Sequence, residues 1–127
     1  MRNRKPDTRP VFLNLLKIRQ PITAVASIAH RIAGVILVMA IPLLIWHLDH
    51  ALATEAGYYD VLTKLSTPLG KIGLLVMGWA LLHHILAGLR FILLDLDIGI
   101  ELASARASAY FVTMAAVLGL VLMVILI

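Results

Sequence analysis

Three long runs of residues without a charged side chain dominate this sequence. Residues 32–48, 72–89 and 107–127 contain no Asp, Glu, Lys or Arg. An α-helix needs roughly 20 mostly apolar residues to cross the hydrocarbon core of a bilayer, and each run reaches that length once its flanking residues are included. Charged residues make up only 14% of the chain, whereas soluble domains contain about 25%. We therefore predict an all-α membrane protein with three transmembrane helices.

The residues next to the apolar runs indicate where the helices begin. Proline suits the first turn of a helix, and the residue before it avoids the helical region, so Gln20-Pro21 predicts the start of the first helix. Ser66 or Thr67 is expected to cap the second helix, with Pro68 in its first turn. The segment between these helices is predicted to be a loop. The predicted helices span about residues 22–49, 68–94 and 105–127, within a three-helix transmembrane anchor domain (22–127) that follows a cytoplasmic or interfacial segment (1–21).

Basic residues cluster before the first apolar run and contribute to a net charge of +4. A basic end of this kind can indicate nucleic-acid binding in a soluble protein. Beside a membrane helix the positive-inside rule accounts for it, so we expect a cytoplasmic N-terminus and no nucleic-acid partner. No cleavable signal peptide is predicted, because the first apolar run starts too late and lacks a small-residue cleavage pattern. The basic residues are Arg2, Arg4, Lys5, Arg9, Lys17 and Arg19.

Two adjacent histidines, His83 and His84, lie within the second apolar run. Ionisable residues inside a bilayer usually face a partner, a cavity or a cofactor. The chain has no cysteine, which excludes thiolate-ligated haem and iron–sulfur clusters in this chain. Neighbouring helical residues point about 100° apart, so only one of the two can face a given iron. His84 shares a stripe of small residues with Ala80 and Gly88, and we predict that it is an axial ligand of haem iron. The alternative is that both histidines hydrogen-bond to neighbouring helices.

The first helix contains a second group of polar residues. Ser27 and Arg31 are four residues apart and share a face of the helix. Arg31 keeps its charge, so it must pair with an anion, face a polar cavity or extend its guanidinium to the membrane surface. We predict a pocket in which Ser27 and Arg31 offer a hydroxyl and a cation to a quinone oxygen or a haem propionate.

His30 is the other histidine near the same side of the bilayer. A rise of 1.5 Å per residue, counted inward from Arg90, places His84 about 9 Å deeper than His30. One chain is therefore not expected to supply both axial ligands, and the second should come from another subunit. Asp95 and Asp97 could pair with an arginine of either helix or relay protons. The alternative is that both are solvated carboxylates at the membrane interface.

Four stretches of the chain together form a more specific pattern. They are Arg9-Pro10-Val11, residues 18–24 (IRQPITA), residues 27–34 (SIAHRIAG) and residues 84–90 (HILAGLR) with Asp95. In order and spacing they resemble the cytochrome b556 subunit of bacterial succinate dehydrogenase over about residues 9–95. Two positions depart from that family. Phe91 stands where a second histidine is often found, and Ala33 replaces the usual hydroxyl residue.

The resemblance implies that the chain is half of a heterodimeric haem-binding helix bundle in the bacterial inner membrane. Members of the family pair with a second three-helix anchor subunit, share one haem b with it, and dock an iron–sulfur subunit and a flavoprotein subunit on the cytoplasmic side. By position, His84 matches the haem iron ligand, and Ser27 and Arg31 match residues of the quinone pocket. His30 and Arg31 lie where contacts to the haem propionates are expected. The second axial histidine comes from the partner anchor, and the C-terminus of this chain is expected in the periplasm.

The function that the resemblance implies is that of a haem-containing anchor of succinate:quinone oxidoreductase, complex II of the tricarboxylic acid cycle. Succinate is oxidised in the soluble subunits, so no catalytic residue for that step is expected here. Electrons then pass from the iron–sulfur subunit to ubiquinone or menaquinone. The alternatives are an anchor of a quinol:fumarate reductase, a cofactor-free structural anchor, and a small transporter. The paired broken helices typical of transporters are not evident in this sequence.

Overall fold

The computed structural model describes residues 18–127 of the chain. Predictions for the basic N-terminal segment therefore lie outside the described residues, apart from its last few positions. The described part folds into α1 (Ile22–Ala53), α2 (Glu55–Ser66), α3 (Pro68–Asp95) and α4 (Leu102–Leu126), with no strand. The all-α prediction is confirmed.

Three of these helices are long and apolar enough to span a membrane. The most apolar windows of α1, α3 and α4 have mean hydropathies of 2.2, 1.8 and 2.6, respectively. Large apolar side chains are exposed along all three helices, as expected where lipid or another membrane subunit covers them. The predicted three transmembrane helices are confirmed. Thr67 caps α3 as expected, since its hydroxyl accepts a hydrogen bond from the Gly70 amide at 3.1 Å, with Pro68 as the first helical residue.

The predicted loop between the first two apolar helices is wrong. α1 continues to Ala53, beyond the predicted end at residue 49, and α2 occupies most of the remaining segment. Thr54 separates the two helices because its backbone is extended (φ −154°, ψ 157°), and its hydroxyl accepts a hydrogen bond from the Gly57 amide at 2.9 Å. A second stabilising contact joins the Lys64 ammonium to the Asp60 carboxylate at 2.7 Å, one helical turn apart. A cap and an i,i+4 ion pair are the usual local supports of a short, polar helix.

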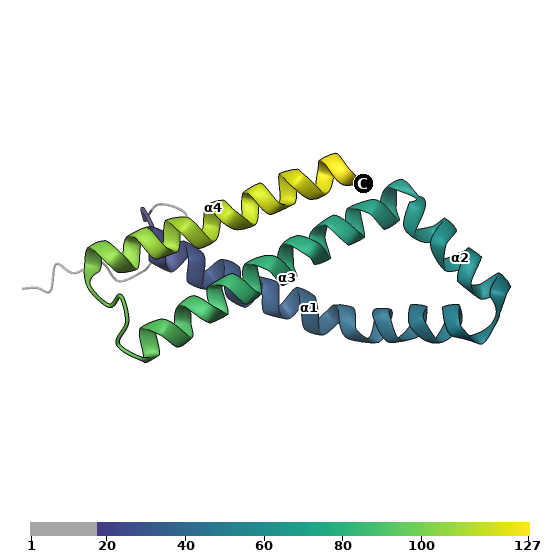
Figure 1. Cartoon of the computed structure of the whole chain (residues 1–127), viewed down its shortest axis with the longest axis horizontal. Coiled ribbons are helices and arrows are strands. Elements are labelled where there is room, and N and C mark those ends of the chain that lie inside the picture. Colours follow the sequence, from purple (N-terminus) through teal and green to yellow (C-terminus); the bar gives the residue numbers. More distant parts are fainter. Residues whose placement is uncertain (1–17) are drawn as a thin grey trace, which may run out of the picture.

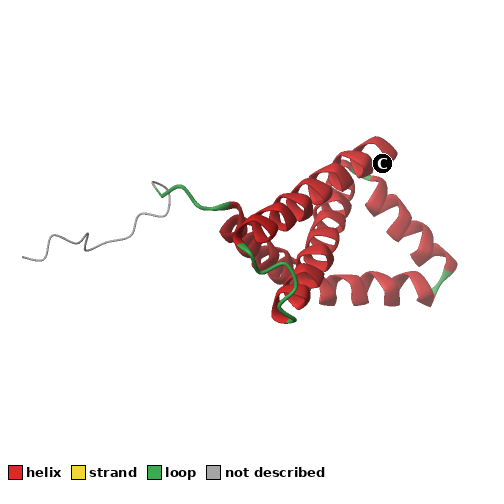
Figure 2. Ribbon diagram, turned by 60° about the vertical axis from the view of Figure 1, so that its left-hand side comes forward, coloured by secondary structure: helices red, strands yellow, loops and turns green. Residues whose placement is uncertain are grey.

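Helix α3 packs against both other membrane-spanning helices. α1 crosses it, α4 lies along its other side, and α2 joins the far ends of α1 and α3 (Figures 1 and 2). The beginning of α1 and the α3–α4 turn lie at one end of the molecule, while α2 and the C-terminus lie at the other (Figure 1). At that second end, the Lys71 ammonium donates a hydrogen bond to the carbonyl of Ile127 at 2.9 Å.

The contacts between these three helices are made mainly by small residues. Alanine lets helix backbones approach closely, which drives helix association where lipid already solvates apolar side chains. The buried positions recur at spacings of three, four or seven residues, so each helix turns one narrow stripe towards its neighbours. These positions are Ala26, Ala33 and Ala40 on α1, Ala80, His83, Ala87 and Arg90 on α3, and Ala109, Val112 and Ala116 on α4.

The α3–α4 turn begins with a Schellman motif. The amide of Ile98 donates to the carbonyl of Leu93 at 2.9 Å, and the amide of Asp97 donates to the carbonyl of Leu94 at 3.0 Å. Asp97 adopts the left-handed conformation that this motif requires, with φ of 59°. Aspartate tolerates this conformation better than most residues. The motif ends α3 abruptly and directs the chain back towards α4.

Candidate functional site

His84 is held by α1 through one ring nitrogen. Its Nδ1 lies 3.2 Å from the backbone carbonyl oxygen of His30. A carbonyl oxygen only accepts, so Nδ1 carries the proton and Nε2 keeps its lone pair. Within residues 18–127, Nε2 has no hydrogen-bond partner. Metal-bound histidines typically donate their other ring N–H to a carbonyl or carboxylate, so this tautomer suits coordination of a metal through Nε2.

Gly34 creates the space that His84 occupies. A Cβ atom at this position would lie 3.1 Å from Cε1 of His84 and 3.5 Å from its Nδ1. The first of these distances is shorter than normal van der Waals contact. Any larger residue would therefore push the imidazole ring away from α1 and disturb its hydrogen bond to His30. The resemblance placed Gly34 within a motif, and the contact supplies the physical reason for glycine there.

A groove of about 680 Å³ opens beside His84 between α1 and α3. Its volume is within the range of small-molecule and cofactor sites. Arg31 and His84 are the two residues in its lining with ionisable side chains, and the rest of the lining is apolar. This surface suits a large apolar ligand with an anionic group near Arg31 and a metal near His84. The lining residues are Arg31, Gly34, Val35, Leu37, Val38, Met39, Ile41, Leu44, Leu81 and His84.

The predicted difference in depth between His30 and His84 is wrong. Their rings stack with centroids 4.1 Å apart and planes inclined by 8°, so the two residues lie at the same level of the bundle. Axial ligands must point their nitrogens at one iron from opposite faces of the macrocycle, and rings in parallel contact cannot do so. Phe91 stands where the family often has a histidine. Its ring packs edge-on against the His30 ring, with the ring centroids 5.2 Å apart.

His83 faces the interior of the chain, away from His84. Its side chain is only 2% exposed, and Nε2 donates to the carbonyl of Ala26 across a long 3.4 Å contact. The ring also stacks on Trp79. The alternative prediction, that both histidines hydrogen-bond to a neighbouring helix, holds for His83 and also for His84 through its Nδ1, and the second ring nitrogen of His84 is what leaves the haem-ligand prediction open. Ala80 belongs to this buried stripe, which corrects its assignment to the side of His84 alone.

The structure brings only part of the predicted quinone pocket together. Arg31 is exposed and lines the groove, whereas Ser27 is half-buried and lies outside the groove lining. His30 is also half-buried and outside that lining. His30 contributes to the groove indirectly, because its carbonyl and its ring both hold His84.

Arg90 does not pair with either predicted aspartate. It is 6% exposed. Its Nε donates to Ser108 Oγ at 3.0 Å, and Nη2 donates to the carbonyl of Ala105 at 3.1 Å. Ser108 is a functional contact that no sequence pattern indicated. The signal that could have found it is that a buried arginine needs acceptors, and Ser108 is a hydroxyl residue of α4 within reach.

These features define a class of protein: a multi-pass membrane anchor of three long helices, with a histidine-bearing groove open on one side. Residues 5–124 match the family model described as the succinate dehydrogenase/fumarate reductase transmembrane subunit. The chain belongs to this family.

Two curated relatives support the assignment, and both are named succinate dehydrogenase cytochrome b556 subunit. The protein of Coxiella burnetii (strain RSA 493 / Nine Mile phase I) is 35% identical over 116 residues, which cover 90% of this chain and 92% of the relative. The protein of Paracoccus denitrificans is 36% identical over 101 residues, which cover 80% of this chain and 78% of the relative. The resemblance seen in the sequence is thus confirmed, and the similar proteins are subunits of succinate dehydrogenase.

Proposed function

We propose that this chain is the haem b-binding anchor subunit of a succinate:quinone oxidoreductase. The observation that supports this most directly is that His84 Nε2 has no hydrogen-bond partner within residues 18–127, and that His84 lines an apolar groove whose lining also includes the permanently charged Arg31. Both relatives reported above are cytochromes b556 of succinate dehydrogenase, which favours this direction of electron flow over fumarate reduction. When bound, a haem b would accept and release single electrons.

In this proposal Arg31 and His84 of the groove, and His30 beside it, have separate tasks. His84 Nε2 would hold the haem iron, and the His30 carbonyl fixes the tautomer in which Nε2 keeps its lone pair. Arg31 offers a planar cation to a haem propionate or to a quinone oxygen, where it would stabilise developing negative charge. Ser27 lies one turn earlier on α1, outside the groove lining, and its hydroxyl contact to quinone stays a prediction. The contact between His30 and a propionate stays a prediction.

The proposed partners follow from what this chain lacks. Since the His30 and His84 rings stack on each other, His30 is not placed to be a second ligand of the same iron, and we propose that a second ligand would come from a second three-helix anchor covering the groove. An iron–sulfur subunit and a flavoprotein subunit would dock at the end of the molecule where α1 begins, on the cytoplasmic side. The substrate taken from the membrane is ubiquinone or menaquinone.

The first test is the absorption spectrum of the purified complex. The dithionite-reduced complex should show a sharp b-type band, and His84→Ala should remove it because the iron loses its ligand. His47→Ala is the matched control, since the His47 Nδ1 also donates to a helix carbonyl, that of Leu43, at 2.7 Å. An unchanged band in His84→Ala, with the band lost in His83→Ala, would show that the wrong histidine has been chosen. No band in the wild-type complex would favour a structural anchor without cofactor.

The second test concerns Arg31 and quinone. Arg31→Lys keeps the charge but loses the planar fork, so we expect quinone reduction to slow by about tenfold while succinate oxidation by a soluble dye is unchanged. Arg19→Lys makes the same exchange outside the groove and should leave both activities unchanged. Equal quinone reduction in the wild-type and Arg31→Lys complexes would remove Arg31 from the proposed quinone site.

A further inference from the structure

A second cavity lies on the other side of α3 from the His84 groove, against α4. It has a volume of about 310 Å³ and is bounded by α3, α4 and the turn between them. It shares no lining residue with the groove. Its lining is apolar apart from one arginine and two serines. The lining residues are Leu86, Leu89, Arg90, Leu93, Leu94, Ile98, Gly99, Ser104, Ser108, Phe111 and Val112.

Arg90 brings into this cavity a charge that no carboxylate of residues 18–127 pairs with. Arg90 is only 6% exposed, and arginine does not lose its proton. Its two hydrogen-bond acceptors, Ser108 Oγ and the Ala105 carbonyl, are both neutral. Within residues 18–127, the ion pairs join Asp60 to His50 and Lys64, so no carboxylate there neutralises Arg90. A buried charge without a counter-ion is costly, and an anion in the cavity would remove that cost.

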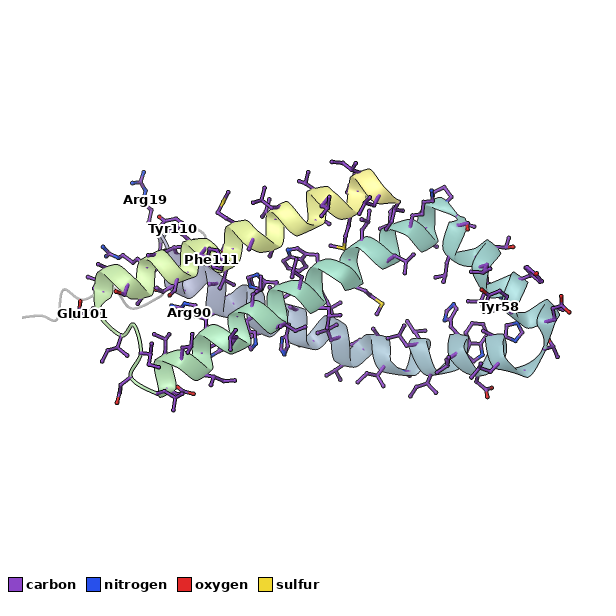
Figure 3. The ribbon with its side chains drawn as sticks, in the orientation of Figure 1. Arg19, Tyr58, Arg90, Glu101, Tyr110 and Phe111 are labelled. Carbon is purple, nitrogen blue, oxygen red and sulfur yellow. The ribbon has the colours of Figure 1, made fainter. Side chains whose placement is uncertain are left out.

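The position of the cavity limits what that anion can be. Arg90 lies near the end of α3, at the same end of the molecule as Glu101 in the α3–α4 turn and Phe111 on α4 (Figure 3). This is where a membrane-spanning helix leaves the hydrocarbon region and lipid headgroups begin. The apolar lining next to the cation favours a ligand that combines an anionic head with hydrocarbon chains.

We propose that the α3–α4 cavity binds the phosphate head of an anionic membrane phospholipid. Arg90 donates charge-assisted hydrogen bonds to a phosphate oxygen, and the apolar wall formed by residues such as Leu93 and Phe111 packs against the upper part of an acyl chain. The cavity is too small for a whole phospholipid, so the rest of the chains extend into the bilayer. The site does not depend on the proposed haem or quinone sites, because it lies on separate residues.

The test is lipid retention by the purified complex. The complex is reconstituted into nanodiscs that contain equal amounts of phosphatidylglycerol and phosphatidylcholine, returned to detergent, and examined by native mass spectrometry. We expect the wild type to retain phosphatidylglycerol preferentially. Arg90→Gln should reduce that retention by about tenfold, as the loss of a hydrogen bond to a charged group implies. Arg106→Gln is the matched control, since Arg106 is an exposed arginine of α4 outside the cavity.

A second variant keeps the proposal testable if Arg90→Gln fails to assemble. Leu93 lines the cavity and is 40% exposed, so Leu93→Trp should obstruct it while leaving Arg90 and its partners in place. This variant should also lose phosphatidylglycerol. The proposal is overturned if both variants retain it like the wild type, or if phosphatidylcholine is retained equally. A thermal shift with inorganic phosphate equal to that with phosphatidylglycerol would identify a simple anion site and would also overturn it.

Discussion

The adjacent histidines of α3 lie in different surroundings because a helix turns neighbouring side chains in different directions. His83 points inward, where the Ala26 carbonyl and the Trp79 ring fill its surroundings. His84 lines a groove, and within residues 18–127 only one of its ring nitrogens has a hydrogen-bond partner. The sequence predicted this separation from the angle between neighbouring helical residues. It could not predict the His30 carbonyl as the partner, because that contact depends on how α1 crosses α3.

Gly34 offers a test of how closely α1 must approach His84. Gly34→Ala places a Cβ at 3.1 Å from His84 Cε1, so the ring must shift and its hydrogen bond to His30 must weaken. Loss of a hydrogen bond that orients a metal ligand typically lowers metal affinity by about 10–100-fold, so we expect haem to bind about tenfold more weakly in this variant. Haem content of the purified complex after a wash with apomyoglobin measures the effect.

The control for Gly34→Ala is Gly73→Ala on α3. A Cβ at Gly73 meets no atom within 4 Å, so this variant makes the same chemical change without a steric one. Haem content should match the wild type in Gly73→Ala. If Gly34→Ala also matches the wild type, then the close approach of α1 to His84 is not needed for haem binding.

At the scale of single elements, the sequence predicted the membrane-spanning helices well and the connection between them poorly. The long apolar runs and the Thr67-Pro68 start of α3 are local features of the sequence, and they were sufficient to predict the membrane-spanning helices. α2 is short and polar, and its tyrosines and glycine equally suit a loop.

The depth of His30 relative to His84 was mispredicted for a different reason. Counting residues gives depth along one helix, whereas the offset between two crossing helices is set by their packing.

The stability of α2 should depend on pH through Asp60, which pairs with Lys64 within α2 and with His50 of α1. The hydrogen bond from Lys64, more than the contact with His50, holds the pKa of Asp60 below its ordinary value of 3.8. A carboxyl whose pKa is lower in the docked state stabilises that state above the ordinary pKa. The stabilisation is lost as the pH falls through the lowered value.

Hydrogen exchange of α2 amides between about pH 6 and pH 2 measures this effect, once intrinsic rates are corrected. We expect protection of α2 to fall at the acid end of this range while α4 stays protected. In Asp60→Asn the protection of α2 should be lower at the neutral end and should not change with pH in this range. A wild-type α2 whose protection is equal at both ends of the pH range would show that the Asp60 contacts do not stabilise this helix.

The whole molecule is arranged around α3, which borders two sites on different sides. The His84 groove lies between α3 and α1, and the Arg90 cavity lies between α3 and α4. The outer surfaces of the helices are apolar and exposed. Apolar periodicity predicts that such surfaces exist, but it does not say whether lipid or a second subunit covers each of them. Whether lipid or a second subunit covers a given surface depends on molecules outside this sequence. The sequence therefore predicts the three helices but does not identify what packs against them.

The orientation in the membrane is the last prediction, and it follows from charge and from the arrangement of the helices. The start of α1 and the α3–α4 turn lie at one end of the molecule, and α2 lies at the other (Figure 1). If the basic N-terminus is cytoplasmic, Glu101 in that turn is cytoplasmic and Glu55 in α2 is periplasmic.

The chain has no cysteine, so Glu55→Cys and Glu101→Cys each introduce a unique thiol at an exposed position. A membrane-impermeant maleimide that reaches the periplasm of intact cells should label Glu55→Cys. It should label Glu101→Cys only after the inner membrane is opened, with the cysteine-free wild type as the blank. The reverse pattern would invert the topology and would place the proposed docking side of the soluble subunits in the periplasm.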